Sequence, residues 1–298
     1  MKVAVTGASG LIGGALVERL RGEGHQVTRV VRRESRGPDE VSWDPRAGHI
    51  DAAGLEGHDA IVHLAGESLI GLWTRAKKAR IRESRIAGTR LLAEAISGLR
   101  RKPEVLVSGS AMGFYGDRPF NEPVDEDAPA GKGFLAETAQ QWEQAAEPVT
   151  RTGVRVVYAR TSLVLSNKGG MLPAVLPLFR LGLGGQLGDG TQPWSWITLE
   201  DEVRALMHMI DRTDLRGPVN LAAPGAVTNA EFTRALASAV HRPALFRVPA
   251  FALRMAGEDF ANGMMLGGAR LVPNRLLNSG FIFEHPDLQS ALTALLTS

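Results

Sequence analysis

Residues 1–33, MKVAVTGASGLIGGALVERLRGEGHQVTRVVRR, contain the pattern that decides the fold. An apolar run at residues 3–5 has the composition of a strand and leads into a glycine-rich turn. Apolar residues then recur at helical spacing from Ile12 to Leu20. Two glycines end this segment, and residues 26–31 return to a β-branched, strand-like composition. We therefore predict a strand–helix–strand unit at the start of the chain.

The glycines of the turn follow the pattern Gly7-x-x-Gly10-x-x-Gly13. The first allows a tight turn, the second lets a pyrophosphate approach the backbone, and the third lets the helix pack against the strand. The helix N-terminus then offers free N–H groups to phosphate. An ordinary strand–helix turn is the alternative, but the position between a predicted strand and a predicted helix favours a dinucleotide-binding turn.

The end of the second predicted strand carries Arg32 and Arg33. An NAD site usually places an acidic residue here to hold the ribose 2′-hydroxyl. Guanidinium groups suit a 2′-phosphate instead, because their planar donors match its oxygens. A solvated basic loop is the alternative explanation. The pair predicts NADP as the cofactor.

The composition excludes several classes of protein. The chain has 298 residues, of which 44% are hydrophobic, so it can form a large core. Its 34 basic and 32 acidic residues nearly balance, which argues against nucleic-acid binding. The absence of cysteine excludes disulfides and thiolate sites, and we expect no metal site. No apolar run reaches membrane-spanning length and no signal sequence precedes the first strand, so we expect a cytoplasmic protein that does not bind membranes.

Residues 59–66, DAIVHLAG, predict another buried strand. His63 lies inside it, and we interpret it as a core residue rather than a catalytic one. Glu67 follows at the carboxyl end of the strand, the edge at which ligands bind in open α/β sheets. Three roles remain open for this carboxylate: a ribose ligand, an acid or base acting on a substrate, or a helix cap.

A long basic helix is predicted over residues 73–97, and Arg85 within it is a candidate for contact with the cofactor. The next predicted strand, residues 105–108, runs into Ser110 and Tyr115. Hydroxyl groups at a strand end suit carbonyl and alcohol redox chemistry, in which serine binds the substrate oxygen and tyrosine transfers the proton. We therefore predict Tyr115 and Ser110 as the catalytic residues.

Strands and helices alternate over residues 1–165, which predicts parallel strands with right-handed crossovers. From residue 166 onward glycine and proline become frequent. We predict a dinucleotide-binding domain over residues 1–165 and a substrate-side segment with a C-terminal extension over residues 166–298. Strands from the second part can complete the sheet of the first.

The chain resembles the extended short-chain dehydrogenase/reductase superfamily. The shared marks are the glycine turn, Leu64-Ala65-Gly66, and Ser108-x-Ser110 followed by Tyr115-Gly116. It is more closely similar to the atypical branch called "epimerase family protein", through segments such as HLAGE at 63–67, LGLGG at 181–185 and WI at 196–197. The resemblance implies an α/β fold, a Rossmann doubly wound parallel sheet with a smaller C-terminal domain, and an extension that begins near residue 248.

The resemblance places the pyrophosphate at the glycine turn, Arg32 at the 2′-phosphate, residues 64–66 at the adenosine, Arg85 at the phosphate or ribose and Val164 at the nicotinamide. Together with the residues inferred directly, the predicted cofactor-binding set is Gly7, Ser9, Gly10, Leu11, Ile12, Gly13, Arg32, Arg33, Leu64, Ala65, Gly66, Glu67, Arg85, Ser108 and Val164.

The chain departs from the superfamily at its acid–base pair. Extended members carry Tyr-x-x-x-Lys on the helix after the serine strand, where this sequence has Leu135 and Ala139, or Phe134 and Thr138 in the neighbouring register. Thr198 also replaces a histidine that relatives often carry. The atypical branch is known for the same loss of the Tyr/Lys pair.

Three hypotheses follow for the function. The first is an NADP-dependent oxidoreductase or epimerase-like enzyme that acts on a small carbonyl or sugar-type substrate with relocated acid–base groups. The second is a non-catalytic NADP(H)-binding redox sensor or scaffold. The third, a nucleotide-sugar epimerase, rests on the family label alone. The sequence leaves open whether the protein is a monomer or a homodimer.

Overall fold

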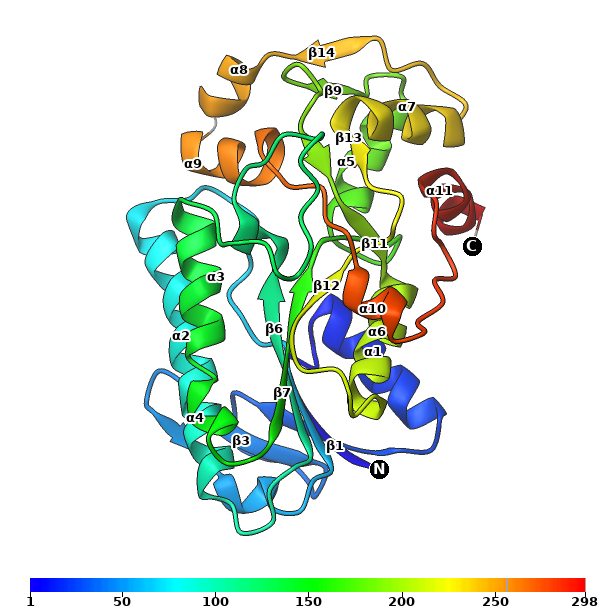
Figure 1. Cartoon of the computed structure of the whole chain (residues 1–298). Helices are drawn as coiled ribbons and strands as arrows, with labels where there is room; N and C mark the ends of the chain where they lie inside the picture. Colours follow the sequence, from blue (N-terminus) through cyan, green and yellow to red (C-terminus); the bar gives the residue numbers. More distant parts are fainter. Residues whose placement is uncertain (256, 298) are drawn as a thin grey trace.

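The computed structural model describes residues 1–255 and 257–297. These residues form a central sheet with the strand order β12-β7-β6-β5-β1-β2-β3-β4, parallel except for β4, which runs antiparallel to β3 (Figure 1). The strands are β1 (Lys2–Thr6), β2 (Gln26–Val31), β3 (Glu40–Asp44), β4 (His49–Ile50), β5 (Ala60–His63), β6 (Val105–Ala111), β7 (Arg155–Thr161) and β12 (Gly217–Leu221). The predicted doubly wound parallel sheet is confirmed.

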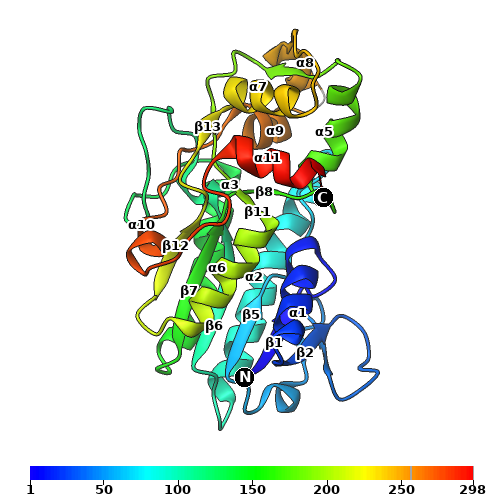
Figure 2. The ribbon, with the colours of Figure 1, turned by 90° about the vertical axis from the view of Figure 1, so that its right-hand side faces the viewer.

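Helices cover both faces of the sheet, as the two views show (Figures 1 and 2). One face carries α1 (Leu11–Gly22) and α6 (Leu199–Asp211). The other carries α2 (Arg75–Gly98), α3 (Phe134–Gln144) and α4 (Glu147–Thr150). Alternate residues of the strands fill two separate apolar cores: in β7, Val157 and Ala159 face α6, whereas Val156 and Tyr158 face α2 and α4.

The long basic helix α2 begins two residues later than the sequence pattern predicts. Thr74 is its N-cap, and the Thr74 hydroxyl accepts a hydrogen bond from the backbone N–H of Lys77. Capping of this kind satisfies an N–H group that the first helical turn leaves without a partner. The helix therefore begins at Arg75, and Trp73 packs instead against Phe134 and Phe260.

The second half of the chain returns to the sheet before it forms the smaller part of the molecule. Strand β12 pairs with β7, and α6 packs beside α1, so the sheet extends past the predicted boundary at residue 165. The smaller part lies beyond the carboxyl ends of the strands (Figure 1). Its helices are α5 (Met171–Arg180), α7 (Asn229–Ala239), α8 (Ala250–Met255), α9 (Glu258–Ala261), α10 (Asn274–Asn278), which packs on β12, and α11 (Leu288–Thr297).

Short two-stranded pairings join these helices. They are β8 (Leu163–Leu165) with β11 (Trp196–Thr198), β9 (Gly185–Leu187) with β14 (Phe246–Val248), and β10 (Pro193–Trp194) with β13 (Val227–Thr228). A single predicted strand over residues 194–197 is thus divided at Ser195, whose buried hydroxyl donates to the carbonyl of Ala269 and accepts from the N–H of Leu271. In the described part of the chain, no helix is both long enough and apolar enough to cross a membrane.

Candidate functional site

The glycine turn between β1 and α1 is packed too tightly for side chains. Gly7 has φ +68°, and a Cβ atom there would lie 2.8 Å from the carbonyl carbon of Leu64. A Cβ atom on Gly13 would lie 2.3 Å from the carbonyl oxygen of Gly7. Both glycines are therefore required by the close approach of backbone segments.

The N-terminus of α1 is open to an anion. Gly10 is its N-cap, is exposed, and offers no side chain to satisfy the N–H groups of the first turn, which also contains no acidic residue. Of the predicted neighbours, Ser9 is exposed, and Leu11 and Ile12 are half-buried. Unsatisfied N–H groups at the positive end of a helix dipole fit a pyrophosphate.

The loop after β5 is fixed beside this turn by one threonine. The Thr6 hydroxyl accepts hydrogen bonds of 3.1 Å from the N–H groups of Leu64 and Ala65, and lies 2.7 Å from Nδ1 of His63. His63 is fully buried, and burial lowers its pKa to about 4. The structure therefore places His63 in the core, and Leu64 and Ala65 of the predicted adenosine side directly next to Gly7, with Gly66 beside Arg85.

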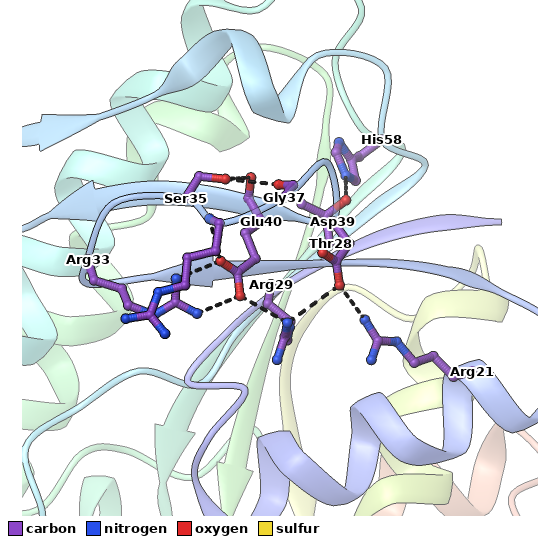
Figure 3. Close-up of polar contacts among 10 residues, drawn as sticks. Arg21, Thr28, Arg29, Arg33, Ser35, Gly37, Asp39, Glu40 and His58 are labelled. Atoms are coloured by element: carbon purple, nitrogen blue, oxygen red, sulfur yellow. Dashed lines mark hydrogen bonds and ion pairs between the residues drawn. The ribbon is translucent and has the colours of Figure 1, made fainter.

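The two arginines after β2 have different surroundings. Arg33 forms a two-pronged ion pair with Glu40, at 2.6 and 2.7 Å, and Arg29 binds the same carboxylate (Figure 3). Hydrogen bonding to Arg33 holds the pKa of Glu40 down at about 2. The exposed Arg32 forms no hydrogen bond or ion pair with its side chain among residues 1–255 and 257–297. The predicted pair is thus divided, and only Arg32 is free to bind a ligand.

Glu67 and Arg85 bind protein groups rather than facing an open cleft. Glu67 forms an ion pair with Lys77 at 2.9 Å, and this contact lowers the pKa of Glu67. The N-cap of α2 is Thr74, not Glu67. The guanidinium of Arg85 donates to the carbonyls of Glu67 and Ile81 and would lie 3.4 Å from a Cβ atom on Gly66. Arg85 therefore supports the loop of residues 66–67, and the helix-cap role considered for Glu67 is wrong.

A buried polar cluster lies at the carboxyl end of β6, on the face covered by α3. The Ser110 hydroxyl donates to Oε1 of Glu143 at 2.6 Å. Arg160 of β7 binds both oxygens of the same carboxylate, at 2.8 and 2.9 Å. The Arg160 and Glu143 side chains are only 4% and 12% exposed, so this ion pair is largely shielded from water. Arg160 thus supplies two charge-assisted hydrogen bonds to this carboxylate.

The structure does not support Tyr115 as a proton donor to a substrate. Its side chain is fully buried, because the 3₁₀ turn η2 (Met112–Tyr115) directs it back under the sheet edge. Its hydroxyl donates to Oδ1 of Asn220 and accepts from Arg160. Burial also raises the pKa of Tyr115 to about 12. Tyr115 therefore contributes to the framework of the cluster, and its buried hydroxyl is occupied by Asn220 and Arg160.

Helix α3 contains both pairs considered for the superfamily positions, Leu135 with Ala139 and Phe134 with Thr138, and neither pair supplies Tyr or Lys. Leu135 packs against Gly113: a Cβ atom added to Gly113 would lie 3.1 Å from the Cβ atom of Leu135. Glu143, one turn further along, is the functional candidate that sequence reasoning missed. The sequence signal that could have indicated Glu143 is Arg160, an arginine at a buried position of the next strand, because such an arginine needs an acidic partner.

The remaining predicted residues lie at the same edge of the sheet or just below it. Ser108 is fully buried within β6 and lies two residues before Ser110 on the same face. Val164 is half-buried in β8, and its carbonyl oxygen would lie 3.6 Å from a Cβ atom on Gly170. Thr198, at the position of the replaced histidine, caps α6. Among the described residues, no cluster of three or more acidic or histidine side chains could hold a metal ion.

Comparison with known proteins agrees with this geometry. A sequence model of the NAD dependent epimerase/dehydratase family matches residues 3–222, and a domain of unknown function, DUF1731, matches residues 248–295, where the extension was predicted. An epimerase family protein of Mycobacterium bovis is 45% identical over 291 residues, which are 97% of this chain and 96% of that protein.

Two solved structures share the fold and more than 30% of the sequence. The human epimerase family protein SDR39U1, crystallised with NADPH, has a TM-score of 0.91 and 33% identity, with full coverage of both chains. A nucleoside-diphosphate sugar epimerase of Corynebacterium glutamicum has a TM-score of 0.82 and 34% identity over 99% of this chain and 58% of its own. Because the family model covers most of the chain and the relatives match it from end to end, this protein belongs to the NAD dependent epimerase/dehydratase family, within its epimerase family protein group.

Proposed function

We propose that this protein binds NADP(H) and is an oxidoreductase or epimerase-like enzyme that acts on a hydroxyl or carbonyl group of a small substrate. The observation that carries the proposal is the Ser110–Glu143 hydrogen bond, which lies at the carboxyl edge of the same sheet as the open N-terminus of α1. This edge is where open α/β sheets bind dinucleotides and their substrates.

The residues present fit the cofactor. The first-turn N–H groups after Gly10 would bind the pyrophosphate, and Arg32 would bind the 2′-phosphate. The human relative that was crystallised with NADPH supports this assignment. When bound, the nicotinamide supplies the acceptor or donor of a hydride.

The direction of the Ser110 hydrogen bond determines what Ser110 can offer a substrate. An ionised carboxylate only accepts hydrogen bonds, so the Ser110 proton points to Glu143 and the lone pairs of its oxygen remain available. Ser110 is therefore arranged to accept a hydrogen bond from a substrate hydroxyl. As that hydroxyl becomes a carbonyl, its proton passes to Ser110 while the Ser110 proton passes to Glu143. Carbonyl reduction reverses these transfers.

The proposal is tested first through the cofactor. NADPH and NADH titrations of the wild type should show a strong preference for NADPH, and Arg32→Ala should weaken NADPH binding by about 10- to 100-fold, the loss of one charge-assisted contact. Binding of NADH should not change in this variant. Arg100→Ala is the matched control, since Arg100 is exposed and precedes β6 at the opposite edge of the sheet. Equal affinity for NADH and NADPH in the wild type would contradict the proposal.

The catalytic part is tested by turnover. A screen of carbonyl compounds, alcohols and nucleotide sugars should find a substrate, and Ser110→Ala should lower kcat by about 100-fold or more, as expected for loss of the group that transfers the proton. Unchanged kcat in this variant would exclude the relay.

A non-catalytic NADP(H)-binding sensor is the second candidate function. The observation that favours it is the absence of Tyr and Lys from α3, where the superfamily carries its acid–base pair, together with the burial of Tyr115. Tight NADPH binding with no hydride transfer across the whole screen would support this candidate over the enzyme.

A further inference from the structure

Glu202 is a buried carboxyl group that the proposed chemistry does not use. It lies near the N-terminus of α6 and is fully buried. Its Oε1 atom accepts a hydrogen bond of 2.8 Å from the Thr161 hydroxyl. Its Oε2 atom is also buried, and no hydrogen-bond partner for it lies in the described part of the chain. Burial of a carboxyl group with one oxygen atom unpaired has a cost in folding free energy, and such a group in a folded protein needs an explanation.

The contact with Thr161 places Glu202 under the carboxyl edge of the sheet. Thr161 is the last residue of β7, and it is paired with Ala111, the neighbour of Ser110, at the end of β6. Helix α6 also packs along α1, whose N-terminus begins at the glycine turn. Glu202 therefore lies at the carboxyl end of β7, on a helix that packs beside the one that would hold the pyrophosphate.

The elements around Glu202 supply no opposite charge. Strands β6, β8 and β11 contain no charged residue. In β7, Arg160 lies next to Thr161 but faces the other side of the sheet, where Glu143 binds it. Arg155 is at the opposite end of the same strand, where it donates to backbone carbonyls at the end of α6, including those of Met209 and Ile210. On α6 itself, Arg204 binds Asp201. The charged residues of α1 lie in its second half, and Arg19 pairs there with the neighbouring Glu23. Burial thus raises the pKa of Glu202 to about 8.

We propose that Glu202 sets the preference of the site between the two redox forms of the cofactor, with its neutral form favouring NADPH and its ionised form favouring NADP⁺. This inference rests on the proposed function. The oxidised nicotinamide ring carries a positive charge that the reduced ring lacks. A carboxylate beneath that edge of the sheet attracts the oxidised ring, and the low polarity of its surroundings strengthens the attraction.

The coupling is reciprocal. If an ionised Glu202 strengthens NADP⁺ binding, then NADP⁺ binding must favour ionisation and release a proton from Glu202. NADPH binding has no such effect. A protein with these properties retains NADPH near neutral pH and accepts NADP⁺ more readily as the pH rises.

The experiment measures dissociation constants of NADP⁺ and NADPH for the full-length protein at pH 7 and pH 9.5. The ratio of the two constants is the readout, because the 2′-phosphate is common to both ligands and its titration cancels. Among the other shifted groups at this edge, the pKa of His63 is about 4 and that of Tyr115 about 12, both outside the interval. Burial lowers the pKa of Arg85 to about 10, and the comparison with Glu202→Gln, which retains Arg85, controls for its titration. In the wild type we expect the ratio to shift about tenfold toward NADP⁺, which corresponds to one unit of pKa coupling.

Two variants complete the test. In Glu202→Gln the ratio should not change with pH, whereas in Glu200→Gln, which alters an exposed neighbour on α6, it should follow the wild type. A pH-independent ratio in the wild type, or an unchanged pH dependence in Glu202→Gln, would overturn the inference. Failure of the wild type to bind either nucleotide would instead overturn the proposed function.

A second measurement avoids substitutions. Calorimetric titration of the wild type at pH 8 in two buffers with different ionisation enthalpies counts the protons released on binding. A larger release with NADP⁺ than with NADPH supports the inference, and equal release with the two ligands contradicts it.

Discussion

Two glutamates lie on opposite faces of the sheet at the end of β7, and their surroundings differ sharply. On the α3 face, Glu143 binds Arg160 through both oxygens and also accepts the Ser110 hydroxyl. On the α6 face, Glu202 has one hydrogen bond, from Thr161. Adjacent residues of a single strand, Arg160 and Thr161, thus give one carboxyl group an arginine partner and the other a hydroxyl partner without a counter-charge.

The difference shows how one sheet edge can hold two carboxyl groups with contrasting surroundings. The ion pair with Arg160 holds Glu143 in position to accept the Ser110 proton. Burial without a counter-charge lets Glu202 gain or lose a proton near pH 8. The first property suits proton transfer, and the second suits a response to the charge of a bound ligand.

The largest effect is expected from Arg160→Met. This change leaves Glu143 charged and shielded from water, and it also removes the donor to the Tyr115 hydroxyl. We expect the free energy of unfolding to fall by about 3–5 kcal/mol, as when one partner of a buried ion pair is lost. Urea denaturation at pH 7.5 measures the change.

The matched control is the double variant Arg160→Met with Glu143→Met. Removal of both charges should recover most of the lost stability, because no unpaired carboxylate remains. A double variant as unstable as Arg160→Met alone would show that the unpaired Glu143 carboxylate is not the cause of the lost stability.

Glu202→Gln should change the pH dependence of stability. Because the pKa of Glu202 lies near 8 in the folded protein and near 4.5 when unfolded, its contribution to stability is full below pH 4.5 and is lost as the pH rises toward 8. The variant has no such loss. The free energy of unfolding of the variant relative to the wild type should therefore increase by about 2–4 kcal/mol between pH 5 and pH 8.5.

Denaturation curves across this range provide the measurement, with Glu200→Gln as the control that should follow the wild type. Parallel curves for Glu202→Gln and the wild type would mean that Glu202 is ionised in both states, which would remove the contrast with Glu143.

The sequence predicts the glycine turn and the alternating elements up to residue 165 because strand and helix periods are local. It also predicts the loss of the Tyr/Lys pair, since neither possible register of α3 supplies those residues. The sequence does not decide whether β12 joins the edge of the sheet, because the pairing of Gly217–Leu221 with β7 depends on contacts between residues distant in sequence.

Site residues were harder to predict where their role depends on the direction in which the side chain points. Tyr115 carries the right chemical group, but the 3₁₀ turn before it directs the hydroxyl to Asn220, and nothing local in the sequence encodes that direction. Arg33 has the same charge as Arg32, but only the structure brings Glu40 against it. In the sequence, Glu202 is one of three acidic residues at the start of a helix. Only the packing of α6 over β7 shows that its carboxyl group is buried.

The smallest effect is expected from Thr161→Val, which preserves the shape of the strand and removes the one hydroxyl that binds Glu202. This hydrogen bond lowers the pKa of Glu202 against the larger effect of burial. Its loss should move the alkaline end of the stability profile to higher pH and change the free energy of unfolding by about 1 kcal/mol. The same denaturation series measures both. Because Thr161 faces away from Glu143, kcat with any substrate found should change little. A profile that does not move would mean that burial alone determines the protonation of Glu202, and the contrast across β7 would then depend on Arg160 and not on Thr161.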